Sequence, residues 1–418
     1  MRHSLSAFAF LAVLGLAGCS SVSHRPAPGP STPASPPTAP APVETAEPPI
    51  TAQPSRPPVT APTLPALPVS SANLKAASFA ALPGWGKDEV KEAWPAFQAS
   101  CNVLIRRVNW HAICVAARDV DASDSAAVRR FFEQHLVPHQ VVNNDGTNTG
   151  MVTGYYEPLL RGARKQGGPF QVPLHAAPED MVGVELSKVY PELRGLRLRG
   201  RMDGGKLVPY YTREELARNR TLNGKELVWV DNAIDAFFLQ VQGSGRVFLT
   251  DTQETVRVAY ADQNGHPYKS IGRYLIDKGE LAAHQASAQG IKAWAAANPA
   301  RLQELLNANP SYVFFKLEKM EGLEVGPKGA LGVPLTPQRS IAVDPQFVPL
   351  GMPVYLSTTQ PNSSAPLQRL VMAQDTGSAI KNPVRADFFW GFGAEAGELA
   401  GRMKQRGTMW VLLPKQGK

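Results

Sequence analysis

Two aspartates in the C-terminal part of the sequence, Asp375 and Asp387, have surroundings that favour acid–base chemistry. Asp375 lies where a predicted strand gives way to a glycine turn, and loops at such positions commonly carry functional groups. Asp387 precedes the aromatic run at 388–390. Apolar surroundings raise the pKa of a carboxyl group, and a general acid needs such a raised pKa. Composition leaves two plainer interpretations open, Asp375 as a turn or cap residue and Asp387 as a surface charge.

The triplet Asp375-Thr376-Gly377 resembles the D-T-G motif of aspartic proteases. Those enzymes need two aspartates that share one proton. The sequence holds a single D-T-G, so a protease of this kind would have to assemble from two copies of the chain. Because a three-residue motif is weak evidence, we disfavour this interpretation.

A second polar group, Tyr155, Tyr156 and Glu157, lies in a strand-like segment. Adjacent strand residues point to opposite faces, so we expect only one tyrosine to line a cleft and the other to pack in the core. A structural role for both tyrosines stays open.

The run Gln242-Gly243-Ser244 offers amide and hydroxyl groups beside glycines. Such groups suit hydrogen bonding to an N-acetylated sugar, although a hairpin turn would explain the glycines equally well. A phosphate loop is disfavoured, because no Walker lysine or G-x-G-x-x-G frame surrounds them.

Composition divides the 418 residues into a tether and a folded part. The stretch from Pro26 to Pro68 holds 16 of the 38 prolines and almost no large apolar residue, so it cannot bury a core. The remaining ~350 residues can build one, given the 43% hydrophobic content of the chain. The net charge of +8 comes from scattered Lys and Arg, which favours an anionic surface or polymer as partner and argues against nucleic acid.

Periodicity in the folded part predicts an α+β, mainly β class, without internal repeats. Helices are expected at 87–118 and 125–136, and again late in the chain at 288–297, 300–306 and 394–404. Strands are expected at 227–230, 237–241, 247–249, 354–356, 367–373 and 409–413.

The N-terminus indicates export. The apolar run from Ala7 to Ala17 is too short to span a bilayer and is typical of a signal peptide. It ends in Leu16-Ala17-Gly18-Cys19, which resembles the bacterial lipobox, with Cys19 as the lipidated residue. An ordinary cleavage site with an incidental cysteine is the alternative. Because Ser20 rather than Asp follows, the resemblance implies the periplasmic face of the outer membrane.

Cys101 and Cys114 are the other cysteines. An exported compartment is oxidising, so we expect them to form a disulfide; two buried free thiols are the alternative. We expect no metal site, because neither C-x-x-C nor H-E-x-x-H spacing occurs.

Taken together, these motifs resemble the membrane-bound lytic murein transglycosylase A family, whose members cleave peptidoglycan. The blocks that carry the resemblance are T-G-Y-Y-E-P at 153–158, Q-G-S-G at 242–245, 260–262 with 266–268, 270–272, 309–312, 342–344, 375–381, and 387 with 391–397. Because these blocks occur in the family's order, the resemblance spans most of the folded part.

The resemblance implies a double-psi β-barrel domain with a second β-rich domain inserted, and a substrate groove between them. The implied domains are a signal peptide at 1–18, a lipidated cysteine and tether at 19–72, the barrel at 73–154 plus 317–418, and the insert at 155–316.

The family's catalytic acid corresponds to Asp387 and a second aspartate to Asp375. We expect the groove to bind peptidoglycan through Tyr155, Tyr156, Glu157, Gln242, Gly243, Ser244, Lys381, Phe388 and Gly391. The expected partners are glycan strands, the outer membrane through Cys19, and other cell-wall enzymes; no cofactor is expected.

The hypothesis for the reaction is cleavage of the bond between N-acetylmuramic acid and N-acetylglucosamine without water, with one aspartate as acid and then base. This would leave 1,6-anhydromuramoyl ends. Two alternatives stay open. A hydrolytic muramidase would use Asp375 or Glu157 to activate water, and a binding lipoprotein would cleave nothing.

Overall fold

The computed structural model describes residues 61–67, 71–193, 196–320, 322 and 324–415. All of these residues belong to one compact unit, Val59–Lys418. The predicted signal peptide, Cys19 and most of the predicted tether lie outside the described residues. Within those residues, every helix is too short or too polar to cross a membrane.

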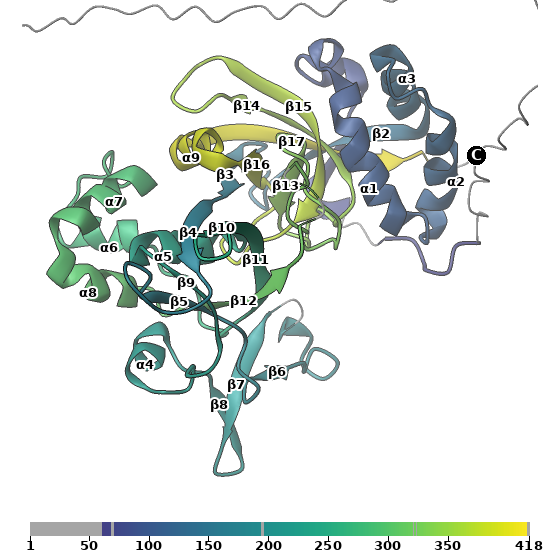
Figure 1. Cartoon of the computed structure of the whole chain (residues 1–418). Coiled ribbons are helices and arrows are strands. Elements are labelled where there is room, and N and C mark those ends of the chain that lie inside the picture. Colours follow the sequence, from purple (N-terminus) through teal and green to yellow (C-terminus); the bar gives the residue numbers. More distant parts are fainter. Residues whose placement is uncertain (1–60, 68–70, 194–195, 321, 323, 416–418) are drawn as a thin grey trace, which may run out of the picture. The chain divides into compact units, whose positions relative to one another are not determined.

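Three helices precede the first long strands: α1 (Trp94–Leu104), α2 (Val108–Ala116) and α3 (Ser125–His135). They lie together beside the barrel (Figure 1), where the sequence predicted helices. Their facing sides are aromatic, with Trp94, Phe97 and Phe132 almost fully buried.

The expected disulfide is confirmed. Cys101 of α1 and Cys114 of α2 are bonded, with their Cα atoms 5.4 Å apart. The bond closes the turn between the two helices on the buried side of the pair.

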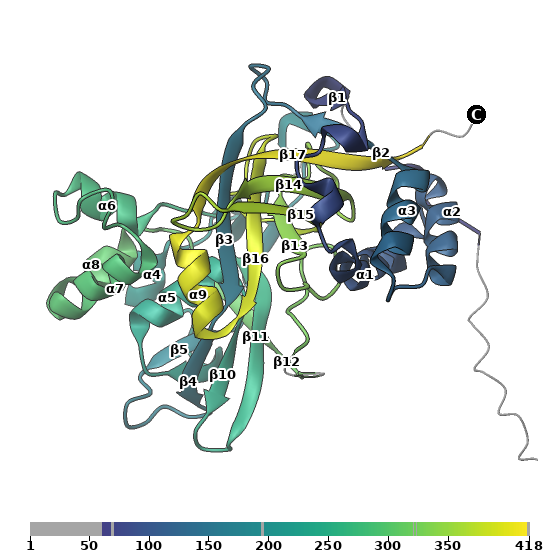
Figure 2. The ribbon, with the colours of Figure 1, turned by 90° about the horizontal axis from the view of Figure 1, so that it is seen from above.

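One sheet closes into a barrel. Its strands are β1 (Leu74–Ala76), β2 (Leu136–Val141), β3 (Gly150–Glu157), β13 (Ser340–Val343), β14 (Pro353–Thr359), β15 (Pro366–Asp375), β16 (Arg385–Phe392) and β17 (Lys404–Pro414). The pairing runs β17-β14-β15-β13-β16-β3, and β3 then pairs with β17 again, so six strands form a ring. β2 continues the sheet from the far half of β17, and β1 pairs with β2. Figure 2 shows β3 and β16 side by side.

The barrel and the N-terminal helices share one continuous hydrophobic core. Alternate residues of each strand point into it, as the two-residue period of a strand requires. Helix α9 (Gly393–Arg402) connects β16 to β17, close to where the sequence predicted a late helix, and packs on β3. A Cβ atom on Gly154 would come within 2.9 Å of the Ala400 backbone, so only glycine allows this approach.

A second domain is inserted between β3 and β13. Its sheet has the order β12-β11-β10-β4-β9-β5, and a bridge between Ala176 and Phe315 joins the two ends into a nearly closed barrel. The strands are β4 (Leu159–Ala163), β5 (Val172–His175), β9 (Glu226–Val230), β10 (Gly245–Leu249), β11 (Glu254–Gln263) and β12 (Val313–Glu318). The mainly β fold with an inserted β domain is thus confirmed.

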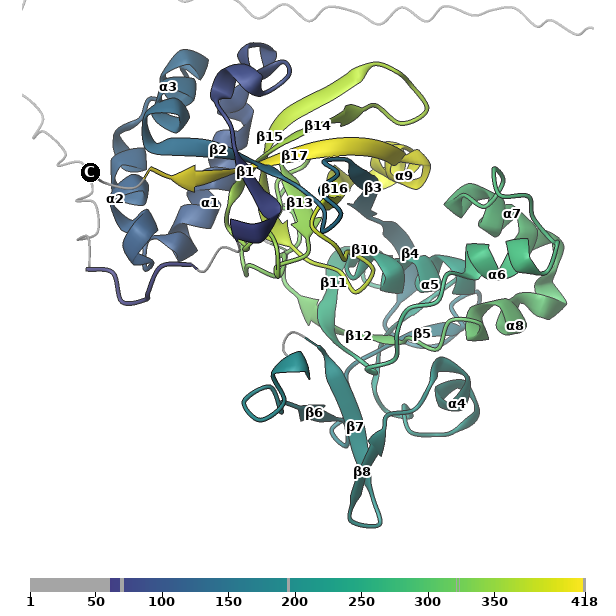
Figure 3. The ribbon, with the colours of Figure 1, turned by 180° about the vertical axis from the view of Figure 1, so that it is seen from behind.

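The insert carries a small second sheet, β6 (Val182–Val184), β7 (Leu198–Asp203) and β8 (Lys206–Pro209). Figures 1 and 3 show the β7–β8 hairpin projecting from the rest of the insert. Its helices are α4 (Arg213–Arg218), α5 (Ala233–Gln242), α6 (Ile271–Asp277), α7 (Ala288–Ala297) and α8 (Leu302–Asn307). Both predicted helices near residues 288–306 are present.

The predicted strand at 237–241 is wrong, because these residues belong to helix α5. The side chain of Asn232 accepts hydrogen bonds from the amides of Ile234 and Asp235, which starts the helix. The run of aromatic and β-branched residues favoured a strand by composition, but tertiary packing of one apolar helix face outweighs that preference.

The two chain crossings between barrel and insert meet at a buried ion cluster. Glu157, at the end of β3, is 1% exposed and binds Arg246 of β10 at 2.8 Å and Arg257 of β11 at 2.6 Å. Both arginines also donate to the carbonyl of Val325, which lies on the return from β12 to β13. One carboxylate therefore ties the outgoing strand, the insert and the returning chain together.

We predict that Glu157→Gln lowers the free energy of unfolding by about 3–5 kcal/mol, because two buried guanidinium groups lose their counter-charge. Urea unfolding followed by circular dichroism measures this. The matched control is Glu214→Gln, whose exposed pair with Arg218 should contribute about 0.5 kcal/mol or less. Equal stability of the two variants would contradict the role of the cluster.

Candidate active site

Strand register aligns the two predicted aspartates on one face of the barrel wall. Asp375 of β15 pairs with Ala342 of β13, Ala342 with Asp387 of β16, and Asp387 with Thr153 of β3. Two strand spacings separate the aspartate backbones by about 10 Å. The alternate residues belong to the barrel core, so this row faces outward. It borders a pocket of about 670 Å³ between barrel and insert.

A small apolar cluster lies beside the two carboxyl groups in the pocket wall. It consists of Tyr155, Leu335, Ala342, Ile380 and Phe389, all of which are buried and border the pocket. Asp375 and Asp387 stay partly accessible from the pocket. Each carboxyl group is thus enclosed by protein except where a ligand could reach it.

Asp387 has the environment that the sequence predicted. Burial raises the pKa of Asp387 above its ordinary value, and the nearby charge of Asp375 adds to the rise. The Thr153 hydroxyl, 2.5 Å from Oδ1 of Asp387, and the Arg385 charge act in the opposite direction. Burial has the larger effect, so the pKa of Asp387 lies above that of an ordinary aspartate.

The hydrogen bonds around Thr153 determine which oxygen of Asp387 carries the proton. Arg385 Nη2 donates to Thr153 Oγ1 at 2.9 Å, and guanidinium groups can only donate. The Thr153 hydroxyl therefore accepts from Arg385 and donates to Oδ1 of Asp387. Since Oδ1 is an acceptor, the acid proton belongs on Oδ2.

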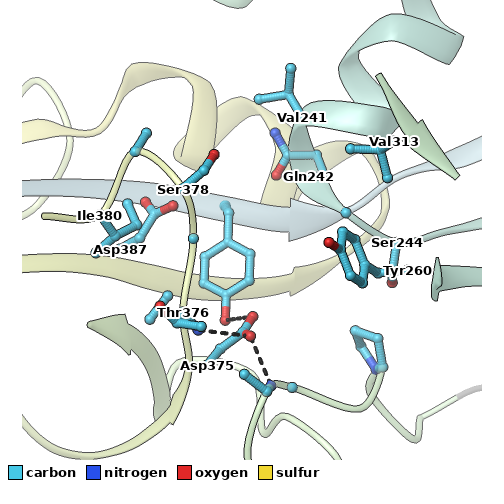
Figure 4. A pocket seen from close by; sticks show the side chains of 18 of the residues that line it. Val241, Gln242, Ser244, Tyr260, Val313, Asp375, Thr376, Ser378, Ile380 and Asp387 are labelled. Atoms are coloured by element: carbon cyan, nitrogen blue, oxygen red, sulfur yellow. Dashed lines mark hydrogen bonds between the residues drawn. The ribbon is translucent and has the colours of Figure 1, made fainter. Parts of the chain in front are cut away.

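Asp375 is held by three donors. Its Oδ1 accepts from the backbone amides of Ala330 and Thr376, each at 2.9 Å, and its Oδ2 accepts from the Tyr155 hydroxyl at 3.1 Å. Figure 4 shows the fixed orientation that these bonds give it. Burial raises the pKa of Asp375, while the donors oppose the rise. Asp375 is an anchored group, and the two aspartates do not share a proton as in an aspartic protease.

The insert supplies the residues that border the pocket across from the barrel. Gln242, Gly243 and Ser244 follow the end of α5, and Gly243 terminates that helix with φ of 84°. A helix C-terminus therefore explains this glycine, in place of the hairpin turn that the sequence left open. Tyr260 of β11 and Val313 of β12 border the same pocket (Figure 4).

The two adjacent tyrosines both border the pocket, so the expectation that only one would do so is wrong. Tyr155 packs against Phe389, with ring centroids 5.1 Å apart, and its hydroxyl reaches Asp375. Tyr156 lies on the other face, against Gly397 of α9, and its backbone amide donates to Gln242 Oε1 at 3.0 Å. That bond holds the backbone of Tyr156 beside Gln242, which also borders the pocket.

Four residues expected to bind substrate lie outside the pocket lining. Glu157 is enclosed by the two arginines of the ion cluster, so it can neither touch a glycan nor activate water. Phe388 points into the barrel core, because it alternates with Asp387. Gly391 is buried beside Pro337, and Lys381 is exposed to solvent instead of the pocket.

Thr153, Arg385 and Ala330 are functional residues that no motif in the sequence predicted. The first two lie two residues before Tyr155 and Asp387 on the same strands, and a two-residue period would have placed them on the same face. Ala330 contributes only its backbone amide, which no side-chain pattern reveals. Across the described ranges, no three His, Cys, Asp or Glu side chains come together as a metal site.

Two family models match the chain. The MltA specific insert domain matches residues 151–316, and the 3D domain matches residues 339–413. The first range contains β4 to β11 and most of β12, and the second contains both pocket aspartates.

Known proteins resemble the chain over most of its length. The membrane-bound lytic murein transglycosylase A of Vibrio cholerae is 32% identical over 299 residues, which cover 70% of this chain and 72% of that protein. The structure of the lytic transglycosylase LtgG of Burkholderia pseudomallei is 48% identical, covers 86% of this chain and 100% of its own, and superposes with a TM-score of 0.57. Escherichia coli MltA with bound chitohexaose is 26% identical, with coverage of 77% and 90% and a TM-score of 0.59.

We predict that Thr153→Val raises the pKa of Asp387 further, because the variant removes a donor that stabilises the ionised carboxylate. Carboxyl-carbon NMR titration of Asp387 measures this. Thr153→Ser keeps the donor and is the matched control, with a pKa close to that of the unaltered protein. A titration of Thr153→Val that coincides with the control would show that Thr153 does not act on Asp387.

Proposed function

The chain belongs to the membrane-bound lytic murein transglycosylase A family and is a peptidoglycan-cleaving enzyme of the lyase type, and we propose that it cleaves the β-1,4 bond between N-acetylmuramic acid and N-acetylglucosamine without water. The observation that carries the proposal is Asp387, a carboxyl group at the edge of the pocket whose pKa is raised by burial. Of the two aspartates there, it is the one with an oxygen that no described donor binds.

In the first step, Oδ2 of Asp387 gives its proton to the glycosidic oxygen. The bond to the anomeric carbon of the muramoyl residue then breaks, and the N-acetylglucosamine residue leaves with a free hydroxyl. Positive charge develops on the muramoyl ring as an oxocarbenium-like state. The Thr153 hydroxyl supports the newly formed carboxylate, because it already donates to Oδ1.

In the second step, the ionised Asp387 accepts the proton of the muramoyl carbon-6 hydroxyl. That oxygen closes on the anomeric carbon and forms the 1,6-anhydro ring. The proton removed equals the proton donated in the first step, so Asp387 returns to its starting state and no water is consumed. A raised pKa of Asp387 suits both steps of the reaction. It keeps a proton available for the first step, and a weaker acid leaves a stronger conjugate base for the second.

Asp375 acts as a positioning and charge-supporting residue in this proposal. Its three donors hold it in one orientation, two strands away from Asp387. When ionised, it places negative charge near the developing oxocarbenium. Tyr155, Tyr156, Gln242, Gly243 and Ser244, which border the pocket, are the proposed sugar-binding residues.

The environment of both candidate bases argues against a hydrolytic muramidase. Such an enzyme needs a second carboxylate that can activate water. Glu157 is sealed in its ion cluster, and the three donors to Asp375 stabilise its ionised form and so weaken it as a base. A binding lipoprotein without activity would not need a carboxyl group with a raised pKa in its pocket.

For the location, we propose the periplasmic face of the outer membrane, with lipidated Cys19 as anchor and the Pro-rich stretch as a spacer. The support is the lipobox in the sequence and the word membrane-bound in the names of the relatives. Glycan strands are the proposed partner, as chitohexaose is for the E. coli structure. Other cell-wall enzymes remain proposed partners.

We predict that Asp387→Asn lowers cleavage of purified peptidoglycan by about 10²–10⁴-fold, because the amide can neither donate an acid proton nor accept one. Binding to sacculi should persist, since the side chain keeps its shape. Mass spectrometry of the soluble products provides the measurement, because an anhydro end is one water lighter than a reducing end. Asp121→Asn, at an exposed position, is the control and should cleave normally.

Two results would reject this mechanism. Unchanged turnover in Asp387→Asn would remove Asp387 from the chemistry. Reducing ends in place of anhydro ends would show that the enzyme is a hydrolase.

A further inference from the structure

Arg213 is a buried cation in the wall of the pocket. It is 6% exposed and lies at the start of α4 in the insert. Its Nε donates to the Asn309 carbonyl at 3.1 Å, and its Nη2 donates to Gln240 Oε1 and the Ser311 carbonyl, both at 2.6 Å. All three acceptors are neutral, so they orient the guanidinium without cancelling its charge.

The rings beside Arg213 hold its plane in place. The guanidinium carbon lies 4.8 Å from the ring centroid of Phe237 and 5.0 Å from that of Tyr312. Stacking on aromatic faces stabilises a guanidinium, but it supplies no counter-ion. Among the described residues, no carboxylate forms an ion pair with Arg213.

One nitrogen of Arg213 remains available to the pocket. Nη1 donates to none of the described residues, and it is not among their fully enclosed unpartnered atoms. Because Arg213 borders the pocket, Nη1 is the group that it presents there. Burial lowers the pKa of Arg213 to about 10, so the group stays charged at neutral pH.

The acidic residues of the pocket do not offset this charge. Asp375 accepts from Ala330, Thr376 and Tyr155, and Asp387 accepts from Thr153, so neither carboxyl group is bound to Arg213. Glu318 is paired with Lys316 at 2.9 Å. A desolvated charge without a counter-charge is unfavourable, unless a ligand brings one.

We propose that Arg213 recognises a carboxylate of the glycan strand in this pocket. The inference rests on the proposed function, which makes peptidoglycan the substrate. Two sources offer the same chemistry: the lactyl acid of a muramoyl residue without a peptide, and an acid of the stem peptide where one is attached. Chitohexaose, the glycan in the E. coli structure, carries no carboxylate and could not form this contact.

Arg213 is therefore a specificity residue, which distinguishes acidic strands from neutral chitin-like ones. A charged hydrogen bond in a desolvated site should change affinity for the acidic strands about tenfold or more. Affinity for neutral sugars depends on other pocket residues and should change little.

Binding experiments in the Asp387→Asn background test this without turnover. Three ligands are compared: glycan strands with stem peptides, strands freed of peptides by an amidase, and chitohexaose. Arg213→Gln should weaken binding of the acidic strands about tenfold or more and of chitohexaose less than about threefold. Arg213→Lys keeps the positive charge and should retain part of the preference for acidic strands over chitohexaose.

The two strand ligands identify the source of the carboxylate. A loss confined to peptide-free strands assigns the lactyl acid, and a loss confined to peptide-bearing strands assigns the stem peptide. Equal losses for all three ligands, or no loss for either strand, would overturn the proposal.

A second arm applies if Arg213→Gln does not fold. Inhibition of the unaltered enzyme by N-acetylmuramic acid is compared with inhibition by its neutral methyl ester, and the free acid should be the stronger inhibitor. Equal inhibition would overturn the proposal. Failure of the proposed function would appear separately, as the absence of anhydro products from the unaltered enzyme.

Discussion

The fold depends on one buried carboxylate. Glu157 neutralises Arg246 and Arg257 where the chain leaves the barrel, and the same arginines hold the carbonyl of Val325 where the chain returns. Two chain segments connect the insert to the barrel, and the insert could tilt against the barrel if each segment were fixed separately. Because a single cluster joins the crossings to strands of the insert, the pocket keeps both of its walls in a defined relation.

The chemistry of the pocket follows from register in the barrel wall. Closure of the ring fixes β13 between β15 and β16, so Asp375 and Asp387 cannot approach one another closely enough to share a proton. The parallel pairing of β16 with β3 brings Thr153 to Asp387. The same backbone pattern therefore gives one aspartate an anchoring role and leaves the other with a free oxygen.

Sequence reasoning identified both pocket aspartates, the raised pKa of Asp387, the N-terminal helices, the disulfide and the mainly β class. These features depend on local pattern or on recognisable motifs. It failed where a contact between distant segments decides the outcome. Glu157 is buried by arginines 89 and 100 residues away, so its neighbours in the sequence could not show that it is internal. Phe388 was misplaced for a different reason: it is adjacent to Asp387 on β16, so the two-residue period of a strand places it on the opposite, core-facing side.

The pairing of β3 also sets an order for folding. Its two neighbours, β16 and β17, lie more than 200 residues further along the chain, as the separation of 234 positions from Thr153 to Asp387 shows. While the chain is synthesised from its N-terminus, both edges of β3 stay unpaired until β16 and β17 are present. The whole insert can fold in the meantime. Open edges invite pairing with other chains, and distant pairing is slow. Among the described strands, β3 is therefore the one that waits longest for its first partner.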